Sequence, residues 1–192
     1  MSVACIQKPG KFLLSAKFKA RLAADGRTVQ RDASLFGPPM ELMNKRCIDF
    51  ISRCTNIRNR KRRKVFLSDL RNGYLHAHLS DENPIYMELP EEFRPHGFTS
   101  PCVRVVKALY GLPTAGFDFF NYTRKALLKE NWKEIENFPS VYSKMVNNEL
   151  LILGVYVDDF YLMAPEKEGI AEMENLKKHF LIARRSMAVL VF

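Results

Sequence analysis

The chain has 192 residues, 47% of them hydrophobic, so it can bury one well-packed core and does not belong among disordered proteins. Its 30 Lys and Arg residues against 21 Asp and Glu residues give a net charge of +9, which favours a polyanionic partner such as nucleic acid, although ordinary soluble proteins also carry a modest basic excess. No apolar run approaches the roughly 20 residues that span a bilayer and no secretory leader is visible, so we expect no membrane partner and a location in the cytoplasm or the nucleus.

The first clear element is a strand from Ala16 to Ala23, in which cationic and apolar side chains alternate strictly. Lys17, Lys19 and Arg21 share one face of this strand. Such a row of cations is most often a solvated face, but fixed cations can also neutralise a triphosphate or a nucleic-acid backbone. Both interpretations stay open on the strand alone.

A helix is predicted after the turn-rich passage around Gly37. Its apolar residues recur in steps of three and four, which predicts a stripe that faces the core. The members of this stripe are Met40, Met43, Cys47, Ile51 and Cys54. The four cysteines (Cys5, Cys47, Cys54 and Cys102) lack Cys-x-x-Cys spacing and a nearby histidine, so we expect core thiols and no structural zinc.

The run from Arg58 to Lys64 holds six cations and no acid, which predicts an exposed loop. Such a loop is solvated, contacts nucleic acid or serves as a nuclear-localisation patch. A strand is predicted from Val65 to Leu70, and Asp69 lies at the end of its otherwise apolar face. Further short strands are expected at 85–89 and 103–109, separated by a loop rich in proline.

Thr114 is placed to cap a helix that ends near Asn131. The apolar residues that keep its helical period are Phe119, Thr123, Ala126, Leu127 and Trp132. Two strands, at 141–146 and 149–157, are then joined by Asn147-Asn148, a dipeptide that tolerates the positive φ of a hairpin turn.

Asp158 and Asp159 interrupt an apolar run from Leu150 to Ala164. Buried carboxylates without partners are very costly, so the pair must lie at a wet turn or bind cations, and spacing alone favours the turn. A strand over 160–164 and a helix that begins at Pro165 follow, and the chain ends in an apolar, strand-like segment at 188–192. We expect the side chains on the buried face of this helix to be Ile170, Met173, Leu176 and Phe180.

This order of elements suits an α+β fold, an antiparallel sheet with helices on one face and the other face open to a ligand. Several segments, in this order, resemble the reverse transcriptases of the Ty1/copia class of LTR retrotransposons. They are Lys19-Ala-Arg-Leu22, Val65 to Leu75 with Ile85 to Pro90, Lys107-Ala-Leu-Tyr-Gly-Leu112, and Tyr156-Val-Asp-Asp159. The resemblance runs from about residue 17 to the end, and it favours a metal site over a plain turn at the two aspartates.

The resemblance implies a single reverse transcriptase domain over residues 1–192 with the right-hand polymerase fold. The fingers would cover about 1–63 and 78–110, and the palm about 64–77 and 111–192. The palm would be a ferredoxin-like antiparallel sheet with helices on one face. No thumb, ribonuclease H or integrase sequence is recognised, so we expect a chain truncated before the thumb.

The implied chemistry is RNA-directed DNA synthesis, in which deoxynucleoside triphosphates extend a primer on an RNA or DNA template. Two Mg²⁺ ions about 4 Å apart, with Mn²⁺ as a substitute, would serve this transfer. Asp69 and Asp158 would bridge both ions. Because neighbouring strand residues point to opposite faces, Asp159 would bind one ion or support the site from behind.

The resemblance also implies nucleotide-binding residues. Lys19 and Arg21 would bind the triphosphate, with Lys17 able to replace either, and Tyr74 would close against the sugar 2′ position to exclude ribonucleotides. Thr114 stands where the family usually has the glutamine of a Lys-Gln pair. This departure and the missing thumb keep an alternative open: an inactive retrotransposon remnant that only binds nucleic acid.

Overall fold

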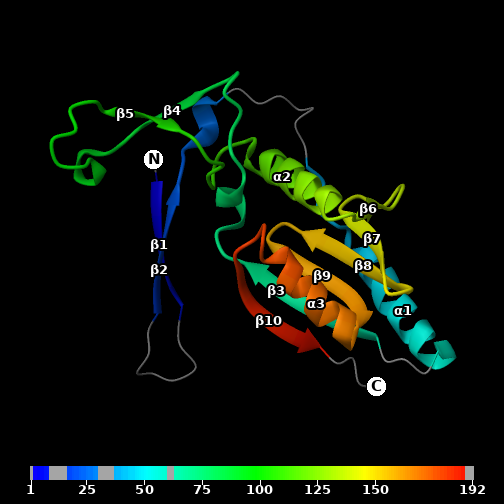
Figure 1. Cartoon of the computed structure of the whole chain (residues 1–192). Helices are drawn as coiled ribbons and strands as arrows, with labels where there is room; N and C mark the ends of the chain where they lie inside the picture. Colours follow the sequence, from blue (N-terminus) through cyan, green and yellow to red (C-terminus); the bar gives the residue numbers. More distant parts are fainter. Residues whose placement is uncertain (1, 9–16, 30–36, 60–62, 189–192) are drawn as a thin grey trace.

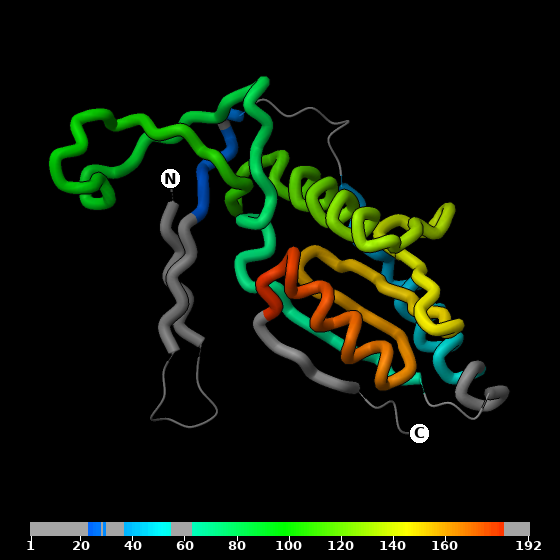
Figure 2. The backbone as a smooth tube through the Cα atoms, in the orientation of Figure 1, coloured from blue at the N-terminus to red at the C-terminus, as the bar shows by residue number. Residues whose placement is uncertain are grey.

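The computed structural model describes residues 2–8, 17–29, 37–59 and 63–188. Within these ranges the strands form two small antiparallel sheets and one larger sheet, in a mixed α+β arrangement (Figure 1, Figure 2). One small sheet pairs β1 (Ser2–Lys8) with β2 (Lys17–Ala23), and the other pairs β4 (Ile85–Glu88) with β5 (Cys102–Val105). The predicted α+β class is therefore confirmed.

The larger sheet has six strands, and every neighbouring pair in it is antiparallel. In spatial order the strands are β10 (Ile182–Ala188), β3 (Arg63–Leu70), β9 (Asp159–Pro165), β8 (Glu149–Tyr156), β7 (Val141–Val146) and β6 (Lys133–Glu134). The predicted hairpin between β7 and β8 turns at Asn147 and Asn148, whose φ angles are 50° and 62°. This turn confirms the expectation from the Asn-Asn dipeptide.

Helices cover both faces of this sheet, so the expectation of helices on one face is wrong. On one face, Phe66 and Leu162 pack with residues of α2 (Ala115–Lys129) and α3 (Glu166–Leu176). On the other face, Ile48 of α1 (Leu42–Asn59) packs against Val65 and Met163. The reason lies in β9, where every residue after Asp159 is buried, because a strand that is apolar on both sides needs cover on both.

The buried side of α1 differs from the predicted stripe. Met43 and Ile51 are 60% and 37% exposed, and Cys47 and Cys54 are also exposed. The buried row instead advances in steps of four residues, through Met40, Asn44, Ile48 and Ser52. Two of its members are polar, so apolar periodicity could not reveal it. Cys102 is exposed as well, so the prediction of core thiols is wrong for the three cysteines whose side chains are described.

The two later helices follow their patterns more closely. Every predicted core residue of α2 is buried, and so is Trp132 beyond its end. In α3, Met173 and Leu176 are buried as predicted, but Ile170 is 43% exposed. Gly169 takes its place because the ring of Phe66 packs directly against the glycine backbone. Among the described residues, no helix is long and apolar enough to cross a membrane.

The described residues of the basic run lie in α1 and β3, not in the predicted loop. Arg58 lies within α1, Arg63 and Lys64 belong to β3, and residues 60–62 lie outside the described part of the chain. Arg63 forms an ion pair of 3.3 Å with Glu149, and Lys64 one of 2.6 Å with Glu166. Through Arg63 and Lys64, this run therefore contributes to the sheet. The predicted strand at 103–109 is shorter in the structure, where β5 ends at Val105. Of the predicted strand at 188–192, only Ala188, the last residue of β10, lies within the described part of the chain.

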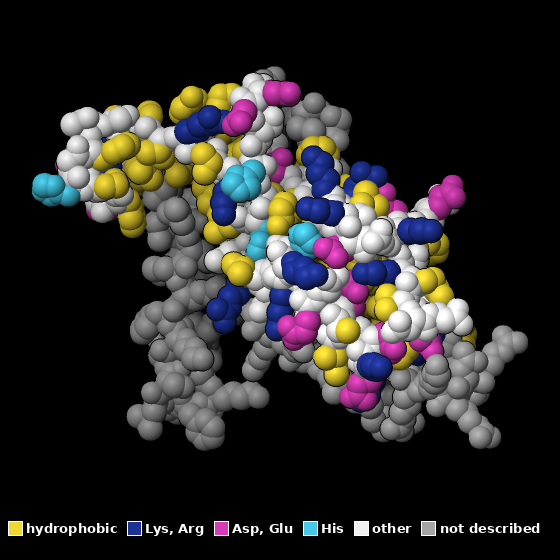
Figure 3. Space-filling view, in the orientation of Figure 1, with side chains coloured by type: hydrophobic (Ala, Val, Ile, Leu, Met, Phe, Trp, Pro, Cys, Tyr) yellow, Lys and Arg dark blue, Asp and Glu magenta, His cyan; other side chains and the backbone are white. Residues whose placement is uncertain are grey.

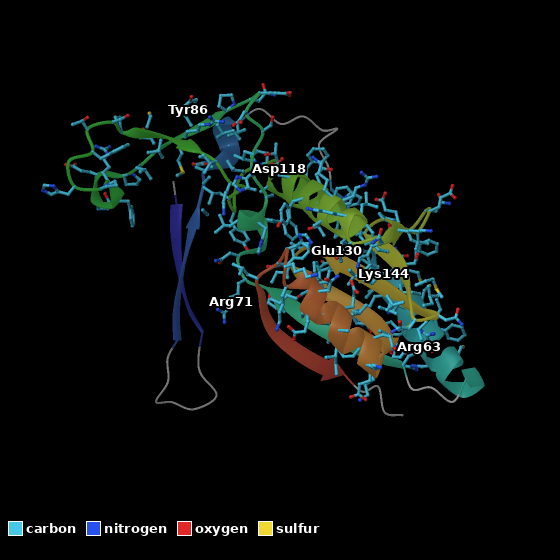
Figure 4. The ribbon with its side chains drawn as sticks, viewed as in Figure 1. Arg63, Arg71, Tyr86, Asp118, Glu130 and Lys144 are labelled. Carbon is cyan, nitrogen blue, oxygen red and sulfur yellow. The ribbon has the colours of Figure 1, made fainter. Side chains whose placement is uncertain are left out.

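A polar network ties α2 to α3 (Figure 4). Glu172 of α3 is buried and accepts hydrogen bonds from Trp132 Nε1 (3.0 Å) and Lys144 Nζ (2.8 Å). Glu130, beyond the end of α2, accepts a hydrogen bond from Asn175 Nδ2 (2.8 Å) and lies 2.7 Å from His179 Nε2. These contacts lower the pKa of the Glu130 carboxyl to about 2, with the bond to His179 as the largest cause.

We expect Glu130→Gln to destabilise the protein at pH 7 and to destabilise it less at pH 3. A carboxyl whose pKa is depressed in the folded state stabilises the fold above its unfolded pKa of 4.5, and this contribution is lost as the pH falls toward about 2. The expected loss at pH 7 is about 0.5–1 kcal/mol, because the pair is near the surface. Urea denaturation at pH 7 and at pH 3 measures it. Glu136→Gln, at an exposed position, is the control, and an equal effect of Glu130→Gln at both pH values would contradict the account.

Candidate carboxylate site

The pairing of β3 with β9 brings two of the predicted site residues together. Asp69 stands directly opposite Asp159 in this antiparallel pair, and Asp159 stands opposite Tyr156 across the β8–β9 hairpin. Side chains of directly opposite residues lie on the same face, with Cβ atoms roughly 5 Å apart. Asp69 and Asp159 therefore share the face that α1 partly covers, and both are exposed at the end of that face.

Asp158 lies in the two-residue turn between β8 and β9, next to Val157. Val157 has a φ of 52°, a left-handed conformation that is unfavourable for a β-branched residue. The backbone N–H of Leu70 donates a hydrogen bond of 2.8 Å to the carbonyl oxygen of Asp158. The strained turn is thereby fastened to the end of β3, immediately after Asp69.

Gly73 packs closely against this turn, although no sequence motif marked it as a site residue. Gly73 is buried, and a Cβ atom added to it would lie only 2.8 Å from the Cβ of Asp158. The preceding Asn72 has a φ of 53°. The signal in the sequence was the Asn72-Gly73 dipeptide, which is typical of a tight turn and carries no hint of its spatial neighbour.

The three aspartates form an acidic group at the end of the sheet. Burial raises the pKa of Asp159, and the charges of Asp158 and Asp69 raise it further. No Lys, Arg or His whose side chain is described forms an ion pair with any of the three. Arg184 of β10 stands opposite Asp69, but its side chain lies outside the described part of the chain. Mutual repulsion among the three carboxylates is the electrostatic setting that a bound cation would relieve.

The donor set fits Mg²⁺ in its chemistry, because hard cations prefer carboxylate oxygen. Among the described residues, no three His, Cys, Asp or Glu side chains converge into a ready-made metal cage. A Mg²⁺ site does not require one, since Mg²⁺ commonly uses one or two carboxylates and completes its shell with water and substrate phosphates.

Two cavities adjoin the aspartates on different sides. A cavity of about 500 Å³ is lined by Asp69 and Asp159 together with Tyr156 and Tyr161, on the α1 face of the sheet. A second cavity, of about 410 Å³, is lined by Tyr74 and Val157 and by residues at the start of α2. Asp69 and Tyr74 thus line different cavities, and the turn that carries Asp158 lies between them.

Tyr74 lies close to the aspartates but belongs to an aromatic cluster. Its ring lies 4.8 Å from that of Tyr110 and 5.9 Å from that of Phe119, measured between ring centroids. Burial raises the pKa of its hydroxyl, and the charge of Asp158 raises it further. Tyr74 therefore stays protonated at neutral pH, with Asp158 as a near neighbour.

The remaining predicted site residues are Thr114, Lys19 and Arg21. Thr114 occupies the N-cap position of α2 as predicted, but its hydroxyl makes no capping hydrogen bond to the helix backbone. Lys19 and Arg21 lie in β2, opposite Ile6 and Ala4 of β1. Their side chains lie outside the described part of the chain.

Comparisons with known proteins agree with these motifs. Residues 6–190 match the protein family described as Reverse transcriptase (RNA-dependent DNA polymerase). The Retrovirus-related Pol polyprotein from transposon TNT 1-94 of Nicotiana tabacum is 27% identical over 169 residues, which is 85% of this chain and 12% of that polyprotein. The chain therefore spans about an eighth of the length of this relative.

Among solved structures, the chain is similar to telomerase from Candida albicans in complex with a fragment of telomeric RNA. The TM-score is 0.43 at 8% identity, over 84% of this chain and 32% of that one. The family match covers nearly the whole chain, and it agrees with the polyprotein relative and with the motifs around Asp69 and Asp158. The predicted resemblance to the Ty1/copia class is confirmed, and the chain belongs to the reverse transcriptase family.

Proposed function

We propose that this domain is an RNA-directed DNA polymerase that adds deoxynucleotides to a primer on an RNA or DNA template. The observation that carries the proposal is the β3–β9 register, which sets Asp69 opposite Asp159 with Asp158 in the adjoining turn. The net charge of +9 supports a nucleic-acid partner. In this proposal the six-stranded sheet with its three helices is the palm, and the two small sheets belong to the fingers. α1, which the sequence assigned to the fingers, would then belong to the palm because it packs on the sheet.

We assign the metal-binding role to Asp69, Asp158 and Asp159. Two bound Mg²⁺ ions, or Mn²⁺ ions in their place, would neutralise charge on the transferred phosphoryl group and favour ionisation of the primer 3′-hydroxyl. Asp69 and Asp159 would contribute carboxylates from adjacent strands on one face. We therefore propose Asp159 as a metal ligand equal in importance to Asp158. The Leu70 N–H bond to the Asp158 carbonyl oxygen holds the backbone of Asp158 at the strand end.

Around this centre, we assign Tyr74 to the sugar of the incoming nucleotide. The ring is braced by Tyr110 and Phe119, so it cannot yield easily to a ribose 2′-hydroxyl. Thr114 would lie on the side of the nucleotide or template, next to the cavity that Tyr74 lines. Lys19 and Arg21 remain the proposed partners of the triphosphate.

Primer extension on poly(rA)/oligo(dT) with Mg²⁺ tests the activity. We expect Asp69→Asn and Asp158→Asn each to reduce the rate by at least about a hundredfold, because each removes charge that stabilises the transition state. Glu136→Asn, which removes a distant exposed carboxylate, should extend like the wild type. Extension by Asp158→Asn at the wild-type rate would exclude the metal role, and a wild-type protein that binds this template without extending it would indicate the inactive remnant.

Asp159→Asn tests the electrostatic cost of the site without an activity assay. A carboxyl whose folded pKa is raised destabilises the fold in its ionised form, so this penalty is present at neutral pH and disappears as the pH falls below the folded pKa. In EDTA at pH 7 we expect the variant to melt at a higher temperature than the wild type. Mg²⁺ should raise the melting temperature of the wild type more than that of the variant, and an equal response of both proteins to Mg²⁺ would count against a cation at Asp159.

Tyr74→Ala should weaken the discrimination between deoxynucleotides and ribonucleotides. Removing the ring removes the proposed clash with the 2′-hydroxyl, and we expect ribonucleotide incorporation to rise at least about tenfold relative to deoxynucleotide incorporation. Single-nucleotide insertion kinetics with dTTP and UTP measure the ratio. Tyr74→Phe keeps the ring and should keep the selectivity, so a loss of selectivity in this control would point to the hydroxyl instead.

A further inference from the structure

Exposed cations gather on the side of the sheet that α2 and α3 cover, away from the carboxylate site. Figure 3 shows Lys, Arg and His side chains gathered in the middle of this face. The exposed cations that we assign to this helix-side basic surface are Arg71, Lys107, Lys125, Lys129, Lys177 and Lys178. The cavity that Asp69 and Asp159 line is on the other side of the sheet, under α1.

Several contacts connect the chain segments that carry the helix-side basic surface. The backbone N–H of Arg71 donates to the carbonyl oxygen of Leu181 (2.7 Å), and His76 Nε2 lies 3.2 Å from the Arg71 carbonyl oxygen. Lys107 is near enough to His76 to lower its pKa, although burial is the larger cause. The hydroxyl of Tyr122 donates to the carbonyl oxygen of His179 (2.7 Å), which links α2 to the turn after α3.

The two lysines of α2 extend the same surface. Lys125 and Lys129 follow Tyr122 at three and seven residues, so they lie on its stripe of the helix. Lys178, at the end of α3, is near enough to Glu130 for its charge to contribute to the lowered pKa of that carboxyl. Arg71 projects from the opposite end, below the loop that holds His76 (Figure 4).

Most of the six cations of this surface are outside ion pairs with described acids. Of its six cations, only Lys177 forms an ion pair with a described acid, at 2.7 Å from Glu174. Glu130, an acid beyond the end of α2, is already bonded to Asn175 and His179. Exposed cations on fixed elements, with histidines and a tyrosine hydroxyl between them, suit a row of phosphates better than a compact anion, because they are spread along a surface.

We propose that the helix-side basic surface binds the sugar-phosphate backbone of RNA, independently of sequence and of the carboxylate site. It would hold a stretch of RNA that is not being copied, on the side of the sheet opposite Asp69 and Asp159. The contacts are to phosphates, so the affinity falls steeply with salt and does not depend on Mg²⁺.

The test is binding of a fluorescein-labelled 20-nucleotide oligo(U) by fluorescence anisotropy, in EDTA and without a primer. We expect Lys107→Glu/Lys178→Glu to weaken binding at least about tenfold and to make the slope of log K against log salt less negative by about 1.4, which corresponds to two lost phosphate contacts on a single strand. A second pair at exposed helix positions, Lys125→Glu/Lys129→Glu, should behave alike. Circular dichroism melts check that the variants are folded.

The matched control is Lys133→Glu/Lys167→Glu, which makes the same change in net charge elsewhere. Lys133 lies in β6, at the opposite edge of the sheet from β10, and Lys167 lies in the first turn of α3, about 15 Å along the helix from Lys177. We expect this control to lose less than about twofold in affinity. Equal losses in test and control variants, or no loss in the two test variants, would overturn the proposal. Because no metal or primer is present, neither outcome depends on whether the protein extends a primer.

Discussion

The antiparallel register between β3 and β9 is the constraint on which the carboxylate site depends. It sets Asp69 opposite Asp159, and the hairpin to β8 then fixes Asp158 beside both. A shift of one residue would turn one of the two aspartates to the α2 and α3 side of the sheet, into an apolar core. The apolar residues that alternate along both strands prevent that shift, because Val65 and Met163 fit the α1 side while Phe66 and Leu162 fit the other.

The carboxylate site destabilises the fold locally. Three carboxylates repel one another, the pKa of Asp159 is raised, and Val157 adopts a left-handed backbone conformation. Such strain persists only where the surroundings impose it. Here the surroundings are the fully buried centre of β9 and the hydrogen bond from Leu70 to the turn. A stable sheet with a locally unfavourable end suits the proposed cation site, in which a bound ion would stabilise the aspartates.

Local patterns in the sequence predicted much of the fold. The alternation in β2, the helical period of α2 and the Asn147-Asn148 turn were all readable, because each depends on neighbours in the chain. The buried side of α1 was not, since Asn44 and Ser52 occupy a buried row that apolar periodicity cannot detect. Cover on both faces of the sheet was also missed, although the unbroken apolar run of β9 is its signature.

The candidate site was predictable in its residues but not in its pairing. The motifs named Asp69, Asp158 and Asp159, while the preference for Asp69 with Asp158 assumed that Asp159 must point away. The structure sets Asp159 opposite Asp69, a relation that depends on the register of residues 90 positions apart and on no local signal. Gly73 was missed for the same reason, because its role is defined by contact with Asp158.

The most direct test of the carboxylate site is anomalous diffraction from crystals of the protein soaked with Mn²⁺ in the presence of primer, template and a non-hydrolysable deoxynucleotide. The account predicts Mn²⁺ peaks about 2 Å from carboxylate oxygens of Asp69 and of at least one of Asp158 and Asp159. Mn²⁺ bound only elsewhere, or Asp69 carboxylate oxygens more than about 8 Å from those of both Asp158 and Asp159, would contradict it, because one ion cannot hold oxygens at that separation.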